Sequence, residues 1–313
     1  MTSTKRILPK GDDGPAAGAT LDELFEHLKE HVEIENKVFP RNDVVEVFIK
    51  TDRPLPIVFS ADWHVGSSGT DYTALQADLA FLAAHPEVKL ALLGDICDNY
   101  GTSFKSSQPV LDQVCSPKMQ RQILVRMVEQ FSKNDTLVAA VGGNHELRDE
   151  HLMGENTFSA ILSKAACVFD NQGIVVLLVG RTRATAAKYV LLLAHKPPSR
   201  SAGDKLSGAK KLYSTKLAAS CICSAHFHDP GITQDTHYNT AREMGLGYGG
   251  RRILLSLGTY CTDDIFSKRH WNGGQLGSPT VLFWPGEYRM EVFSSAPDAL
   301  IYREGMRHWK VTK

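Results

Sequence analysis

The chain has 313 residues, of which 42% are apolar, enough for one large α/β domain or two small ones. Its 35 basic residues balance 35 acidic residues, so the chain as a whole lacks the positive charge typical of a nucleic-acid binder. This composition excludes a disordered chain, and any charge-based recognition of a partner must come from a local cluster.

The chain carries no sign of secretion or membrane insertion. The first ten residues, MTSTKRILPK, are followed by the polar stretch GDDGPAAGAT, so we expect neither a signal peptide nor a membrane anchor. The longest apolar runs, 174–179 and 189–194, are too short to span a bilayer. The six cysteines form no CxxC pair, which favours reduced core residues. We therefore expect a cytoplasmic protein without a membrane partner.

Residues 1 to 50 are expected to form a flexible lead-in followed by an amphipathic helical extension. Residues 1–19 are rich in Gly, Ala, Pro and Asp and lack apolar periodicity. Thr20 and Glu23 then match a capping box. Five apolar residues follow on one helical face: Leu21, Leu24, Phe25, Leu28 and Val32. We expect this helix to dock on the main domain, with binding of a partner protein as the alternative.

From about residue 55 the pattern is mixed α/β, and residues 51–313 are expected to form one domain. Eight short apolar runs predict strands at 56–60, 88–93, 136–141, 174–179, 189–194, 219–224, 253–257 and 281–284. Residues 73–84 and 110–131 have helical patterns. The second half is rich in strands, so a simple alternating βα barrel fits poorly. The Gly-rich segments 233–250 and 261–277 predict loops.

Five of these runs end directly in residues that commonly bind metal ions. In chain order they are followed by Asp62-Trp63-His64, Gly94-Asp95-Ile96-Cys97-Asp98, Gly143-Asn144-His145-Glu146, His195, and His226-Phe227-His228. Strand ends of an α/β sheet meet at one edge, so we expect a single cluster. One such motif alone is usually a surface or turn feature. Five unrelated motifs at successive strand ends would bury several polar groups at one edge of the core, and without a common ligand that burial would cost much free energy. Their order therefore favours a metal site.

The motifs resemble those of the calcineurin-like metallophosphoesterases, which carry D-x-H, G-D-x-x-D, G-N-H-D/E, a separate His and G-H-x-H. The resemblance covers about residues 56 to 230. It implies a four-layer α/β/β/α sandwich as a catalytic domain, whereas periodicity by itself supports only a mixed α/β fold. One position departs from the pattern, because Ala225 stands where the family usually has Gly.

The resemblance also implies a role for each site residue. The implied ligands of one metal ion are Asp62, His64 and His228, and those of the second are Asn144, His195 and His226. Asp95 would bridge the two ions. His145 would protonate the leaving group, and Asp98 would orient that histidine.

The residue types support a dinuclear phosphoesterase without the family name. Two cations bridged by a carboxylate lower the pKa of a shared water, so that hydroxide forms near neutral pH and attacks the phosphoester that the cations hold. A histidine with a pKa near neutral can protonate the leaving alkoxide. Oxygen and imidazole ligands without thiolate lead us to expect two divalent ions, manganese in the first place, with iron or zinc as alternatives.

Two branches of the family fit this sequence poorly. The protein phosphatases carry Arg directly after the second Asp of G-D-x-x-D, where this chain has Asn99. The purple acid phosphatases use a tyrosine ligand in that motif, where this chain has Asp98. The segment His64-Val65-Gly66-Ser67 is similar to the D-x-H-x-G start of double-strand-break repair nucleases and of the small exonuclease subunit of archaeal DNA polymerases. A glycine at that position can equally serve a turn.

Residues 181–216 form a basic stretch, with nine basic residues against Asp204. We interpret the part after His195 as a mobile basic loop beside the metal site, suited to a phosphate backbone. The alternative is a solvated loop without such a role. The candidate substrate contacts are Arg148, Lys196 and Arg200. Three aromatic residues next to ligands offer either base stacking or core packing: Trp63, Tyr100 and Phe227.

Three hypotheses follow for the function. The leading one is a hydrolase of phosphodiester bonds that acts on nucleic acid, as a nuclease, or on a nucleotide. The alternative is a small-molecule phosphomonoesterase or a cyclic-nucleotide phosphodiesterase. The third, a non-catalytic scaffold, is disfavoured because a complete set of buried charged ligands is costly to retain without metal. The expected partner is a phosphoester substrate, with DNA or RNA as candidates.

Overall fold

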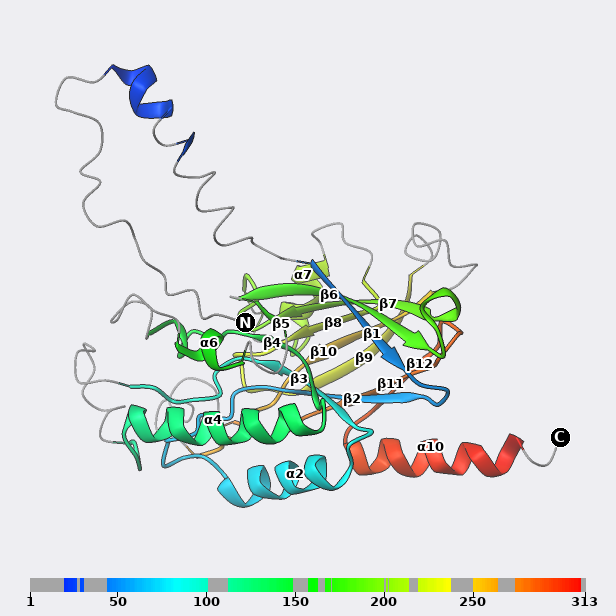
Figure 1. Cartoon of the computed structure of the whole chain (residues 1–313). Coiled ribbons are helices and arrows are strands. Elements are labelled where there is room, and N and C mark those ends of the chain that lie inside the picture. The colour runs from blue at the N-terminus through cyan, green and yellow to red at the C-terminus, as the bar shows by residue number, and fades with distance from the viewer. Residues whose placement is uncertain are drawn as a thin grey trace. The chain divides into compact units, whose positions relative to one another are not determined.

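The computed structural model describes residues 20–26, 29–30, 44–100, 112–148, 157–162, 167–169, 171–199, 201, 203–213, 219–237, 250–263 and 274–310. By compactness the chain divides into two units, Met1–Asp43 and Val44–Lys313 (Figure 1). The domain boundary expected at residue 50 stays a prediction, and residues 44–50 are a strand of the second unit.

The predicted capping box lies at the start of the helix of the first unit, which includes residues 21–26. The backbone N–H of Thr20 donates to Glu23 Oε2 over 2.7 Å, and that of Glu23 donates to Thr20 Oγ1 over 3.3 Å. These reciprocal bonds satisfy N–H groups that have no partner within the helix. The docking expected for this helix stays a prediction.

The second unit is a mixed α/β structure. Its elements are β1 (Val44–Lys50), β2 (Leu55–Ser60), α2 (Tyr72–Ala84), β3 (Lys89–Leu93), α4 (Pro117–Lys133), β4 (Leu137–Val141), α6 (Thr157–Leu162), β5 (Cys167–Phe169), β6 (Gln172–Gly180), η1 (Arg183–Thr185), β7 (Ala187–Ala194), α7 (Ser207–Tyr213), β8 (Cys221–Ser224), β9 (Gly231–His237), β10 (Gly250–Ser256), β11 (Thr280–Phe283), β12 (Met290–Phe293) and α10 (Ala296–Lys310).

The strands form two six-stranded sheets. The first, here the β2 sheet, has the order β12-β11-β2-β3-β4-β5, and the second, the β7 sheet, has the order β1-β6-β7-β8-β10-β9. In the β2 sheet, β2, β3, β4 and β5 run parallel. In the β7 sheet, β7, β8 and β10 run parallel. The chain segments that follow parallel neighbours therefore leave each sheet at the same edge.

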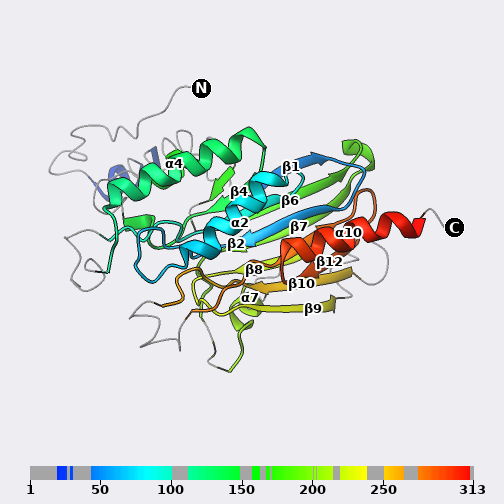
Figure 2. The same cartoon turned by 90° about the horizontal axis from the view of Figure 1, so that it is seen from below.

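Apolar contacts arrange these elements in four layers. Inward side chains of both sheets, such as Phe59 and Leu191, form one core between them. On the outer face of the β2 sheet, Leu92 packs in one cluster with Leu124 of α4, and α2 joins the same cluster. On the outer face of the β7 sheet, Leu212 of α7 packs against the strands. Figures 1 and 2 show α2, α4 and α10 on one side of the paired sheets and α7 on the other, which confirms the α/β/β/α arrangement.

All eight predicted strands are present, but two predicted loops are wrong in part. Residues 233–237 belong to β9, which pairs antiparallel with β10, and residues 238–249 lie outside the described residues. The basic segment after His195 contains the helix α7 instead of being entirely loop. Within 261–277, residues 261–263 and 274–277 have neither helix nor strand, and 264–273 lie outside the described residues.

The helix predicted from residue 110 begins at Pro117. Ser116 caps it by accepting a hydrogen bond from the N–H of Met119, and Pro117 occupies the first turn, where its missing N–H costs nothing. Among the described helices, none combines the length and the apolar character that crossing a bilayer requires.

Candidate metal centre

The predicted ligands leave the two sheets at their facing edges. Asp62 and His64 follow β2, Asp95 follows β3, and the segment Gly143–Glu146 follows β4, all in the β2 sheet. His195 follows β7, and His226 and His228 follow β8, in the β7 sheet. Parallel neighbours thus bring each group together within its sheet, and the stacking of the sheets brings the two groups together.

The backbone of these loops is strained. Among the described residues other than glycine, seven have positive φ, and six of them lie in the ligand loops: Asp62, His64, Asp95, Asn99, His226 and His228. Side chains with a Cβ rarely adopt this conformation, which costs about 1–3 kcal/mol per residue and is found where function requires it. The rest of the fold must therefore hold these loops in place.

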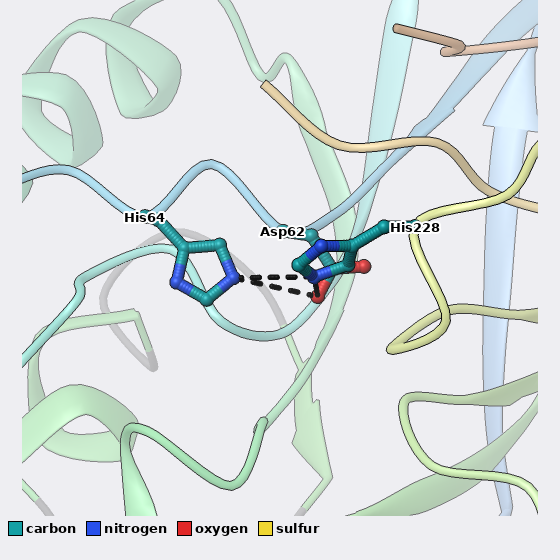
Figure 3. Close-up of side chains that lie close together, drawn as sticks. All are labelled: Asp62, His64 and His228. Atoms are coloured by element: carbon teal, nitrogen blue, oxygen red, sulfur yellow. Dashed lines mark hydrogen bonds and ion pairs between the residues drawn. The ribbon is translucent and has the colours of Figure 1, made fainter. Parts of the chain in front are cut away.

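One cluster consists of Asp62, His64 and His228 (Figure 3). The distance from Asp62 Oδ1 to His228 Nε2 is 3.4 Å and to His64 Nε2 is 3.9 Å. The two Nε2 atoms lie 3.4 Å apart. Figure 3 shows both imidazole rings directed at the carboxylate. Three candidate ligand atoms therefore point at one small volume.

A second cluster consists of Asp95, His195 and His226. His195 Nε2 lies 3.2 Å from Asp95 Oδ2 and 3.2 Å from Asn144 Oδ1. The carbonyl of Leu93 lies 2.6 Å from His195 Nδ1 and fixes the other side of that ring. The Nε2 atom of His195 is therefore directed at the carboxylate and amide oxygens.

Backbone N–H groups hold one oxygen of each aspartate, and one of these bonds crosses between the two sheets. The N–H of His226, from the β7 sheet, donates to Asp62 Oδ2 over 3.0 Å. The N–H of His145 donates to Asp95 Oδ1 over 2.9 Å. One oxygen of each aspartate is thus used to hold a loop, which leaves the other directed at the histidines.

The surroundings of His145 differ from those implied by the resemblance. Its Nδ1 lies 2.6 Å from the backbone carbonyl of Asp98 and 2.9 Å from Arg148 Nη1. The Asp98 carboxylate is closer to His64 Nδ1, at 3.1 Å, than to His145 Nδ1, at 3.7 Å. Arg148 stacks over the Tyr100 ring at 3.7 Å. The Asp98 backbone therefore orients His145, while the Asp98 side chain orients His64.

Glu146 is a buried site residue whose role the motifs did not reveal. Its Oε1 accepts from the N–H groups of Ile96 and Cys97, and its Oε2 from those of Asp95 and Gly143, at 2.7–3.2 Å. Burial and the nearby Asp95 raise the pKa of Glu146 to about 7, although the N–H donors favour its ionised form. Its position at the end of the Gly143-Asn144-His145-Glu146 motif was visible, but its four backbone donors come from turns that the sequence does not reveal.

The carboxylates and histidines perturb one another strongly. Burial lowers the pKa of His64, but the Asp98 hydrogen bond and the neighbouring carboxylates outweigh it and raise the pKa to about 9. For His195, burial acts in the same way, and Asp95 raises the pKa to about 10. Burial raises the pKa of Asp95, but His145 and His195 outweigh it and hold that pKa well below its usual range. The donors are therefore arranged as an anionic pocket that favours a bound cation.

The pKa values of His145 and His226 shift in the opposite direction. Burial, with Arg148 nearby, holds the pKa of His145 well below its usual value, despite the opposing charge of Asp95. Burial and the charge of His195 lower the pKa of His226 to about 4. A neutral imidazole is the form that binds a metal ion, which suits the expected role of His226 as a ligand.

An unpartnered buried atom shows that the donor set fits metal ions. Asp62 Oδ1, the carboxylate oxygen that faces His64 and His228, is buried without a hydrogen-bond partner among the described residues. Buried polar atoms rarely lack partners, so such an exception needs an explanation. Carboxylate, amide and imidazole donors without thiolate suit a divalent transition metal.

The candidate substrate contacts are dispersed. Arg148 is inside the site, as described above, and Lys196 is close enough to His226 to help lower its pKa. Arg200 lies outside the described residues. Arg181 and Arg183 lie before β7, which at about 3.3 Å per residue puts them roughly 26 Å from the His195 end, and they pair with Asp52 and Glu46.

Other cations of the basic stretch are also paired. Lys205 pairs with Asp229 over 2.6 Å, and Lys210 pairs with Asp204 over 2.8 Å. The basic stretch 181–216 is therefore divided between two ends of the β7 sheet, and its charge is partly neutralised.

The aromatic neighbours of the ligands fall into two groups. Trp63 is buried, and its Nε1 donates to Ser60 Oγ over 2.8 Å, so it serves the core. Tyr100 packs edge-on against His145, and Phe227 packs against His226. The last two therefore lie against the site rather than in the main core.

Gly66, which suggested a nuclease motif, has a structural reason of its own. Its φ is +111°, and a Cβ there would lie 2.2 Å from Nε2 of the buried Gln120 of α4. Gln120 Oε1 in turn accepts from the N–H of Asn99, whose side chain donates to the carbonyl of His145. The glycine is therefore accounted for by a turn and a close approach, without any substrate.

Comparison with known proteins identifies the family. The family described as calcineurin-like phosphoesterase matches residues 55–230, more than half of the chain. No curated protein matches. Among solved structures, the chain is similar to the calcineurin-like phosphoesterase YfkN from Bacillus subtilis, with 11% identity, 78% of this chain and 91% of that chain covered, and a TM-score of 0.37. It is also similar to TT1561 of Thermus thermophilus, with 12% identity, coverage of 78% and 99%, and a TM-score of 0.37. The chain belongs to the calcineurin-like phosphoesterase family, whose members are metal-dependent hydrolases of phosphoester bonds.

Proposed function

We propose that this chain hydrolyses phosphodiester bonds in a nucleotide or a nucleic acid at a dinuclear site, with manganese as the preferred metal and iron or zinc as alternatives. The observation that carries the proposal is the pair of Asp/His clusters at the facing edges of the two sheets. In the proposed assignment one ion is held by Asp62, His64 and His228, the second by Asn144, His195 and His226, and Asp95 lies between them. When bound, such ions supply Lewis-acid activation of water and neutralise charge on the phosphoryl oxygens.

Beside the proposed metal ligands, Asp98 positions His145, and His145 protonates the leaving group. His145 Nε2 lies 3.7 Å from Asp95 Oδ2, at the edge of the cluster, where it is placed to protonate the leaving oxygen. Its Nδ1 is held by the Asp98 carbonyl. Burial and Arg148 lower the pKa of His145, which favours its neutral form. We expect the charge of an anionic phosphoester beside the ring to raise this pKa.

The choice between polymer and small substrate rests on local charge. Lys196 follows His195 directly, and Arg148 contacts His145, so two cations flank the site and suit a phosphodiester. The pairing of Lys205 and Lys210 with aspartates weakens the case for a long phosphate track and favours the second candidate, a cyclic or other small nucleotide.

The decisive experiment is a substrate panel with added manganese, iron or zinc, combined with metal analysis of the purified chain. The panel compares bis-para-nitrophenyl phosphate with the mono-ester, and single-stranded DNA, double-stranded DNA and RNA with cyclic nucleotides. We expect the diester to be cleaved faster than the mono-ester. A polymer substrate would also show a steep loss of binding with added salt, because backbone binding releases counterions. Faster cleavage of the mono-ester would overturn the proposal.

The role of His145 is tested by His145→Ala. We expect this variant to bind manganese like the wild type, measured by calorimetry, and to lose about 10²–10⁴-fold in kcat. The matched control is His85→Ala, which alters an exposed histidine at the end of α2. Unchanged turnover in His145→Ala would remove this residue from the mechanism.

A further inference from the structure

A cavity of about 340 Å³ lies behind the metal-ligand loop, on the helical side of the β2 sheet. It is bounded by β2, α2, the segment around Tyr260 and the start of α10. Figures 1 and 2 both show α2 and the start of α10 side by side over β2. A volume of this size is within the range of small-molecule sites. The proposed catalytic chemistry uses none of its lining.

The lining combines aromatic rings with a single charge. Trp63, Phe81 and Tyr260 contribute rings, and the aliphatic wall includes Leu75 and Leu82. Among the residues that line the cavity, Asp78 is the one with a formal charge, and no basic side chain accompanies it. Aromatic faces beside a carboxylate attract an organic cation, whose charge the rings and the carboxylate both stabilise.

The start of α10 does not offer a competing anion site. Ser294, Ser295 and the first residues of α10 reach the cavity, but Ser295 Oγ accepts from the N–H of Asp298 and bonds its carboxylate over 2.7 Å. The start of α10 is thus capped by Ser295. The carboxylate of Asp298 places a further negative charge near this helix end. Charge at this cavity therefore favours a cation.

Hydrogen bonds connect the cavity with the metal ligands. The hydroxyl of Tyr260 donates to Asp78 and lies 3.3 Å from Ser278 Oγ. Ser278 Oγ is 2.9 Å from Ser60 Oγ, which accepts from Trp63 Nε1. Trp63 stands between two proposed ligands, Asp62 and His64, in the chain.

Tyr260 provides a second connection, because its backbone N–H donates to the carbonyl of Asp62 over 3.1 Å. A molecule in the cavity would touch both rings and so bear on the loop that carries Asp62.

We propose that this cavity binds a small organic amine with an apolar body, its ammonium group on Asp78 and its body against Trp63, Phe81 and Tyr260, and that its occupancy changes the affinity of the metal centre. The amine is a ligand and undergoes no reaction.

The test measures binding of three matched probes to the full chain by calorimetry. The probes are phenethylamine, phenethyl alcohol and phenylacetate, which share the apolar body and differ in charge. We expect the amine to bind at least about tenfold more tightly than the alcohol, and phenylacetate to bind most weakly. Equal binding of amine and alcohol identifies a neutral ligand and overturns the proposal, as does the absence of amine binding.

Two variants locate the site. Asp78→Asn, at an exposed position on α2, is expected to reduce the preference for the amine to about twofold or less, whereas Glu129→Gln on α4 leaves it unchanged. Ala74→Phe is expected to fill the cavity and remove binding of all three probes, with its fold checked by circular dichroism. Persistent amine selectivity in Asp78→Asn overturns the assignment.

The coupling is tested by measuring the dissociation constant of the amine with and without manganese, and that of manganese with and without the amine. Linkage requires both ratios to be equal, and we expect a change of at least about threefold. If the amine binds but neither dissociation constant changes when the other ligand is present, the proposed coupling is overturned. If manganese does not bind at all, the proposed function fails, while the probe comparison still decides whether the cavity is an amine site.

Discussion

Glu146 shows how a single buried side chain can hold two ligand loops together. Its two oxygens accept from the N–H groups of four residues, three in the loop after β3 and one in the loop after β4. Those loops carry Asp95 and Asn144. The ionised form of Glu146 is suited to this position because it presents only acceptors.

We predict that Glu146→Gln lowers the free energy of unfolding by about 1–3 kcal/mol, because the new amide group turns donors toward backbone N–H groups that need acceptors. Manganese affinity should fall as well, since the Asp95 loop loses its anchor. Urea denaturation and calorimetry measure the two effects. Glu129→Gln, an exposed change on α4, should stay within about 0.5 kcal/mol of the wild type. Equal stability of both variants would show that the four bonds contribute little.

The raised pKa values of His64 and His195 predict that metal binding releases protons. With pKa values of about 9 and about 10, both rings are protonated at neutral pH in the metal-free chain. Their pairing with carboxylates stabilises that state fully below about pH 6.5, and this contribution is lost as pH rises through about 9 and 10. Metal must displace these protons, so manganese affinity should rise about tenfold per pH unit for each proton displaced.

Calorimetry in buffers of different ionisation enthalpy measures this release directly. At pH 7 we expect about two protons per chain. An affinity that does not change between pH 6 and pH 8 would contradict protonated ligands in the metal-free state.

At the residue scale the sequence indicated the ligand types because each follows an apolar run. It did not indicate which group orients which histidine. The backbone carbonyl of Asp98 holds His145, and this contact depends on the turn after β3 rather than on residue identity. Glu146 was overlooked for the same reason.

Among the elements, α4 reaches the site through one buried amide. Gln120 lies on a helical face that is otherwise apolar, with Leu124 and Phe131, and it bonds the backbone of Asn99. Burying a polar side chain is costly unless it is satisfied, so this placement ties α4 to the loop after β3. Gly66 makes room for it.

We therefore predict that Gly66→Ala destabilises the chain by about 2–3 kcal/mol, since its φ is positive and the added methyl group displaces Gln120. Gly203→Ala is the matched control, because nothing lies within 4 Å of a Cβ at that position. Thermal or urea unfolding measures both. The double variant Gly66→Ala with Gln120→Ala should lose less than the sum of the single changes, because they share one clash. Strict additivity would place the cost elsewhere.

Two elements that the sequence did not predict are an edge strand, β9, and a short helix, α7. β9 contains one strongly apolar residue, Ile232, and resembles a loop in composition, yet it needs only β10 as a neighbour. The helix α7 was not predicted within the basic stretch because, among its described side chains, Ala209 and Leu212 are the apolar ones that pack against the sheet. Central strands such as β2 and β8 were recognisable because every residue in them is buried.

At the scale of the second unit, the candidate metal centre draws its residues from both sheets. Asp62, His64 and Asp95 come from one sheet, and His195, His226 and His228 from the other. Uninterrupted apolar runs cannot reveal which sheet a strand joins, because strands of both sheets are buried on two faces. The motif order resolved the fold class, and the strand pairing required the structure.

We predict that removing metal with a chelator lowers the melting temperature of the chain. At a metal concentration about 100-fold above the dissociation constant, binding to the folded state contributes about 2.7 kcal/mol. Differential scanning calorimetry with and without manganese measures the effect. Asp62→Ala, which removes one proposed ligand, should show a smaller difference between the two conditions. An equal difference in this variant would mean that the metal stabilises the chain from another site.

The strand β1 limits how far the chain can be truncated from its N-terminal side. The family match begins at residue 55, but residues 44–50 pair with β6 along seven positions and cover the edge of the β7 sheet. A fragment that starts at residue 55, where the match begins, and keeps the rest of the chain would present the bare edge of β6. That edge carries a row of unsatisfied N–H and C=O groups to which the strand of another copy can add. Such a fragment is expected to form fibrous precipitate on expression. A fragment that starts before Val44 keeps β1 paired with β6 and is expected to stay free of such precipitate.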